Sequence, residues 1–110
     1  MDPKVTADDV AKALREFMRL HHQFKSDHGV KNYLSNIHEA CNSMTDKHGR
    51  LCRQVKHAER NDPKEDFPES IAEDVAGYLN YGLMVLQNYN VDLADGMKKE
   101  LEKAAVQHKA

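Results

Sequence analysis

One stretch of regularly spaced apolar residues constrains the fold more than any other feature of this sequence. Within residues 69–93, apolar and small side chains recur at intervals of three and four: Ile71, Val75, Tyr78, Leu79, Gly82, Leu83, Leu86 and Tyr89. This spacing is typical of an amphipathic α-helix that turns one face towards a core. Pro63 and Pro68 precede the helix, and Asp66 and Ser70 are alternative N-caps for it.

The rest of the chain predicts three further helices. Thr6 is expected to cap a first helix over about residues 7–25. A second apolar stripe predicts one long helix over about residues 30–59, with a bend or a break at Gly49 as alternatives. Asp92 is expected to cap a last helix. Because β-branched residues are sparse, the predicted fold class is all-α.

These helices predict a four-helix bundle formed by a single domain over residues 1–110. The second helix is expected to pack antiparallel on the helix of residues 69–93. The residues expected to be buried between them are Ile37, Cys41 and Met44 against Val75, Leu79 and Leu83. Because a chain of this size has a small core, we expect a homodimer that buries more apolar surface. Tyr78, Met84 and Val85 are the candidates for its interface.

Composition excludes several classes of protein. The net charge is -2 and the pI is about 6.4, so the sequence carries no basic footprint for nucleic acid. No run of residues is long and apolar enough for a membrane span, and no N-terminal signal pattern is visible. Eleven residues of helix would hold Cys41 and Cys52 roughly 16 Å apart, which is too far for a disulfide. Two reduced cysteines indicate a cytoplasmic protein.

A small set of polar residues is the candidate for a metal site. Glu39 and Asn42 are three residues apart on the second helix, and Glu73 and Asp74 are adjacent on the helix of residues 69–93. If the two helices are antiparallel neighbours, these groups could meet, and carboxylate and amide oxygens suit Mg²⁺. The alternative is that the acids are solvated surface residues. A zinc site is not predicted, because Asn42 stands where an HExxH motif needs its second His.

These residues also carry a resemblance to a known family. The segment 73–93, EDVAGYLNYGLMVLQNYNVDL, is similar in length and pattern to the helix EELADVLIYLLRLADRLGIDL of the MazG-like all-α nucleotide pyrophosphohydrolases, which also embrace the dimeric dUTPases. Glu73 and Asp74 fall on the opening acidic pair of that helix, Tyr81 on its aromatic residue, and residues 91–93 on its closing apolar-Asp-Leu. The segment 38–42, HEACN, falls on the family's EExxE motif.

The resemblance implies a dimeric MazG-like bundle that cleaves a nucleoside triphosphate, NTP or dNTP, to the monophosphate and pyrophosphate. It implies Mg²⁺ held by Glu39, Asn42, Glu73 and Asp74, with Glu39 and Asp74 as the catalytic residues. The chain departs from the family's ExxE and ExxD pairs, because Asn42 and Gly77 stand where the second acids belong. The alternative hypothesis is therefore a catalytically inactive relative that binds a nucleotide or a protein partner through the same bundle.

Overall fold

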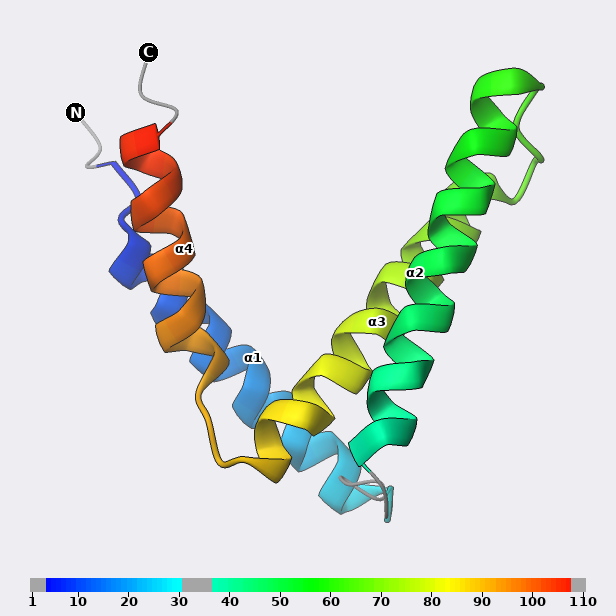
Figure 1. The fold of residues 1–110 in the computed structure, drawn as a ribbon. Helices are drawn as coiled ribbons and strands as arrows, with labels where there is room; N and C mark the ends of the chain where they lie inside the picture. The colour runs from blue at the N-terminus through cyan, green and yellow to red at the C-terminus, as the bar shows by residue number, and fades with distance from the viewer. Residues whose placement is uncertain (1–3, 31–36, 108–110) are drawn as a thin grey trace. The chain divides into compact units, whose positions relative to one another are not determined.

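The computed structural model describes residues 4–30 and 37–107, and the only regular structure in these two ranges is helical. The helices are α1 (Ala7–Asp27), α2 (Ile37–Arg60), α3 (Phe67–Asn88) and α4 (Leu93–Gln107) (Figure 1). The prediction of an all-α fold is therefore confirmed. The chain divides into two compact units, one formed by α1 and α4 and the other by α2 and α3. That the chain forms a single domain stays a prediction.

The predicted N-caps of α1 and α4 are present in the structure. The Asp9 N–H donates to Thr6 Oγ1 at 3.1 Å, and the Thr6 N–H donates to Asp9 Oδ2 at 2.8 Å, which together form a capping box. The bond from the Thr6 backbone is the main cause that lowers the pKa of Asp9. At α4, the Ala94 N–H donates to Asp92 Oδ1 at 2.9 Å. Both predicted caps are therefore confirmed.

The second and third helices differ in detail from the prediction. Val30 is not helical, and the predicted start of α2 at residues 31–36 lies outside the described residues. The helix then continues through Gly49 without a break. Asp66, not Ser70, is the N-cap residue of α3, but over the residues that the structure describes its side chain makes no capping hydrogen bond. Pro68 lies in the first turn of α3, where a missing N–H costs nothing.

The α1/α4 pair packs through small side chains. Ala11 and Ala94 are almost completely buried, so the two backbones can approach closely. Arg15 bonds Asp92 at 3.2 Å and Asp95 at 2.8 Å, whereas towards the other end of the pair Lys98 bonds Asp8 at 2.9 Å. An earlier residue of α1 is thus paired with a later residue of α4, so the two helices are antiparallel. The charges of these three ion pairs lie at the exposed edges of the helix pair and not in its seam.

The α2/α3 hairpin is also antiparallel, as predicted. Gln54 bonds Asp74 on α3, and an added Cβ at Gly82 would lie 3.5 Å from Met44, which is ten residues earlier on α2. Buried and half-buried positions recur every three or four residues along both helices. On α2 they include Ala40, Met44, Lys47, Leu51, Gln54 and Ala58; on α3 they include Phe67, Ser70, Asp74, Gly77, Tyr81 and Met84. The seam of this hairpin therefore contains several polar side chains.

The prediction of which face of α3 packs on α2 is wrong. Val75 is 52% exposed, Leu79 is 39% exposed, and Cys41 on α2 is exposed as well. The seam instead follows Asp74 and Gly77. A Cβ at Gly77 would lie 2.9 Å from Lys47 Cε, so the glycine leaves room for the lysine stem between the helices. The other expected core residues, Ile37, Met44 and Leu83, are half-buried.

Candidate functional site: two faces of the α2/α3 hairpin

A single carboxylate lies at the centre of the α2/α3 seam. The Asp74 side chain is 2% exposed. The Gln54 side-chain amide donates to its Oδ2, and the Arg50 Nε lies 3.6 Å from its Oδ1. Both partners come from α2, one turn apart, so they hold the two oxygens of the carboxylate from the same side. A buried charge in a helix pair needs such partners, because an unpaired one would be strongly destabilising.

The structure does not bring the other predicted ligands to Asp74. Glu39 and Asn42 are exposed in the first turns of α2. Arg50 is the residue of α2 that lies opposite Asp74. Glu39 is eleven residues before Arg50 on the same helix, which corresponds to roughly 16 Å. Glu73, the residue immediately before Asp74, is exposed. The four residues therefore lie at different places on the hairpin.

The surroundings of Asp74 do not fit a magnesium ion. A guanidinium and an amide N–H occupy the oxygens that a cation would bind, and a positive neighbour opposes a second positive charge. Over the described residues, no group of three or more His, Cys, Asp or Glu side chains is placed to hold a metal ion. Magnesium binding and magnesium-dependent cleavage stay predictions, and no step of a mechanism is derived through them.

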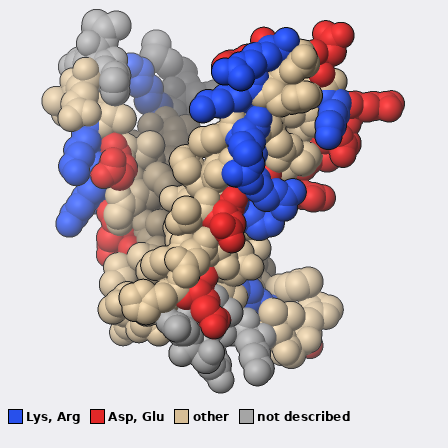
Figure 2. Space-filling model, turned by 45° about the vertical axis from the view of Figure 1, so that its right-hand side comes forward, with Lys and Arg blue, Asp and Glu red and all other residues tan. Residues whose placement is uncertain are grey.

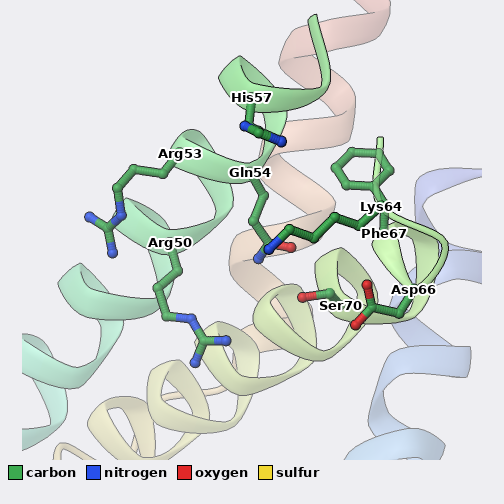
Figure 3. Close-up of a pocket in the computed structure, with 8 residues that line it drawn as sticks. All are labelled: Arg50, Arg53, Gln54, His57, Lys64, Asp66, Phe67 and Ser70. Carbon is green, nitrogen blue, oxygen red and sulfur yellow. The ribbon is translucent and has the colours of Figure 1, made fainter. Parts of the chain in front are cut away.

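One side of the hairpin carries a cavity with several cationic groups. It has a volume of about 490 Å³ and lies between the second half of α2, the loop after it and the first turn of α3 (Figure 3). Its lining residues are Arg50, Arg53, Gln54, His57, Lys64, Asp66, Phe67 and Ser70. This volume falls within the range of small-molecule sites. Figure 2 shows Lys and Arg side chains gathered on part of the surface of this hairpin.

The sequence contains a signal for this cavity that the motif analysis missed. Arg50, Arg53 and His57 are spaced by three and four residues, so they share one side of α2. Lys64 could not be assigned from this spacing, because it lies in the loop between the helices. A neighbouring hollow of about 390 Å³ shares Arg50 and Arg53 and is also lined by Lys47 and by one acid, Asp46.

The other side of the hairpin is apolar. We call the apolar face the surface formed by Leu51, Val55, Val75, Tyr78 and Leu79, together with His48 at its edge. Tyr78 is 44% exposed, and a hollow of about 250 Å³ beside it is lined by Leu51 and Val75 and, on the side of the seam, by Lys47 and Asp74. The His48 and Tyr78 rings lie with their centroids 6.3 Å apart, which joins the two helices on this side. From residue 75 to residue 88, α3 has no charged residue.

None of the helices in the described ranges is both long and apolar enough to cross a membrane. No family model, no curated protein and no solved structure matches this chain.

Proposed function

We propose that this protein is a helical interaction module whose α2/α3 hairpin associates with a second copy of the chain through the apolar face. The observation that carries the proposal is that α3 buries a charged residue and exposes apolar ones. Its one buried charged residue, Asp74, lies in the seam, whereas Val75, Tyr78 and Leu79 lie outside it. Contiguous exposed apolar surface of this kind marks interaction sites.

A second copy is the occupant that the helix geometry favours. Each hairpin presents two neighbouring apolar stripes, and a four-helix bundle closes its core with four such stripes. In a twofold dimer the same surface is used twice, so the apolar side chains of one copy meet those of the other. The half of α3 after Asp74 carries no charge that such a contact would have to bury. Tyr78 was a predicted dimer residue and belongs to this face, whereas Met84 and Val85 are half-buried within the monomer.

Hydrolysis of a nucleoside triphosphate by a MazG-like site is the competing function. It requires Glu39 and Asp74 to act on one metal ion, and the distance along α2 and the partners of Asp74 both weigh against this. An assay of pyrophosphate release with Mg²⁺ and each common triphosphate decides between the two functions. Release that is lost in Glu39→Gln and in Asp74→Asn would favour the hydrolase. We expect no release, which favours the inactive relative with a binding role.

Light scattering on the full chain tests self-association. We expect a mass of about twice the 12.6 kDa of one chain, and we expect Leu79→Glu to shift the protein towards the monomer because it places a charge in the centre of the contact. Gln87→Glu is the matched control, since it adds the same charge at an exposed position of the same helix. A monomer for the unchanged chain, or dissociation by both variants alike, would overturn the proposal.

A further inference from the structure

The cavity beside the first turn of α3 has more positive than negative charge. Arg50, Arg53 and Lys64 are permanent cations among its lining residues, and Asp66 is the one acid among them. The whole chain has a net charge of -2, so this excess is local and does not follow from composition.

Two of these cations are not used by the fold. Arg50 already faces Asp74 in the seam, but none of the ion pairs within the described part of the chain includes Arg53 or Lys64. Gly49 lies under the Arg53 guanidinium, because an added Cβ there would lie 3.3 Å from its Nη1. Figure 3 shows Lys64 reaching from the loop towards Gln54. Neither cation is in an ion pair within the described residues, so binding an anion would break none. Figure 3 shows the exposed Arg53 guanidinium turned away from Lys64, so an anion that contacts both requires the Arg53 side chain to rotate towards the cavity.

The remaining lining residues are suited to the rest of an organic ligand. Asp66 and Ser70 lie near each other on the α3 side of the cavity (Figure 3), and a carboxylate with a hydroxyl can bind ligand hydroxyl groups. Phe67 contributes a half-buried ring, which Figure 3 shows across Lys64 from Asp66 and Ser70, and this ring offers an apolar surface to a sugar or a base. The N-terminal end of α3 adds its positive partial charge to the cations.

We propose that this cavity binds a sugar phosphate, either free or as the ribose phosphate of a nucleotide. The phosphate lies among Arg50, Arg53 and Lys64, and the sugar hydroxyls lie against Asp66 and Ser70. The neighbouring hollow is not part of the site, because Lys64, Asp66 and Ser70 do not line it. The site does not depend on self-association, since Arg50 and Arg53 lie on the side of α2 that is turned away from Val55.

Titration calorimetry on the full chain tests the site with ribose 5-phosphate, AMP, inorganic phosphate and ribose as probes. We expect ribose 5-phosphate to bind more tightly than inorganic phosphate, and ribose without phosphate not to bind. AMP that binds more tightly than ribose 5-phosphate would identify a nucleotide as the source of the sugar phosphate. Equal affinities would identify a free sugar phosphate. If neither inorganic phosphate nor either ester binds, the proposal is wrong.

Variants of the two unused cations locate the site. Arg53→Gln and Lys64→Gln are each expected to weaken binding of ribose 5-phosphate about ten- to hundredfold, as expected for loss of a hydrogen bond to a charged group. Lys56→Gln is the matched control, because it removes an exposed cation of α2 that does not line the cavity. Equal weakening by the control would mean that only the general charge attracts the ligand, and the site would be rejected.

A variant of Asp66 separates recognition of the sugar from recognition of the phosphate. Asp66→Asn keeps a residue that is equally suited to the N-cap position, so the fold is retained. We expect it to weaken binding of ribose 5-phosphate and to leave inorganic phosphate bound as well as before or more tightly. If both probes lose affinity alike, Asp66 does not face the sugar, and the assignment of a sugar phosphate fails.

Discussion

The two helix pairs of this chain differ in whether a charged residue lies in the seam. The α1/α4 pair buries Ala11 and Ala94 in its seam and places ion pairs such as Arg15 with Asp95 at its exposed edges. The α2/α3 hairpin buries Asp74 in its seam and exposes the apolar side chains of Val75 and its neighbours. The first arrangement keeps its charges in ion pairs, although Phe17, Leu20 and Phe24 of α1 are exposed as well. The second leaves apolar surface for another protein surface to cover.

The polar seam of the hairpin specifies how its helices align. A slip of α3 by two turns along α2 would take Asp74 away from both Gln54 and Arg50 and would bury an unpaired charge. Single polar residues in a helix seam are known to set register at a cost in stability. We therefore expect Asp74 to favour one alignment and the apolar face to supply stability once it is covered.

The largest expected effect comes from removing the buried carboxylate. Asp74→Ala leaves the half-buried Gln54 amide without its acceptor, while the Arg50 guanidinium, which is half exposed, turns to water. We expect a loss of about 2–3 kcal/mol in the free energy of unfolding, measured with urea. Asp46→Ala, at an exposed acid of α2, is the control and should change the stability by less than about 0.5 kcal/mol. Similar values for the two variants would show that the seam does not depend on Asp74.

The second effect tests the small seam of the α1/α4 pair. Ala94→Leu adds a large side chain where no exposed surface remains, and it forces the two helices apart. Overpacking of this kind costs about 1–3 kcal/mol. Ala105→Leu makes the same change at an exposed position of α4 and should be nearly neutral. If both variants are equally stable, the close approach of α1 and α4 is not needed for their packing.

Sequence reasoning succeeded where a structural feature depends on neighbouring residues. Thr6 and Asp92 could be assigned as caps because each bonds an N–H two or three residues away. The face of α3 could not be assigned in the same way. Its apolar stripe is wide, and the choice between Leu79 and Asp74 was decided by the side chains that α2 places opposite, Lys47 and Gln54 above all.

The candidate site shows the same limit over a longer range. The prediction that Glu39 lies near Asp74 rested only on the expectation that α2 and α3 are neighbours. The turn between residues 60 and 67 sets how far the two helices are shifted along each other, and it aligns Asp74 with Arg50. Spacing within one helix could have identified Arg50 and Arg53 as neighbours. It could not have shown that the loop brings Lys64 to the same cavity.

The smallest expected effect is a difference between the first turns of α1 and α3 in their stability as the pH falls. Hydrogen bonds from Thr6 hold the pKa of Asp9 below its ordinary value of 3.8. Because the pKa is lowered in the folded state, Asp9 stabilises α1 fully above the ordinary value, and this contribution is lost as the pH falls through the lower folded-state value. Asp66 caps α3 without a side-chain bond in the part of the chain that the structure describes.

We therefore expect acid to lower the amide protection factors, which correct for the pH dependence of the intrinsic exchange rate, in the first turn of α1 before it does so in the first turn of α3. Asp9→Asn should remove much of this difference, because an amide keeps its shape but does not carry the charge that favours the first turn of a helix. The position is exposed, so the change in overall stability is small and the local exchange rate is the informative measurement. If the two turns loosen together in the unchanged chain, the capping box of α1 does not contribute the charge-dependent stability that distinguishes it from α3.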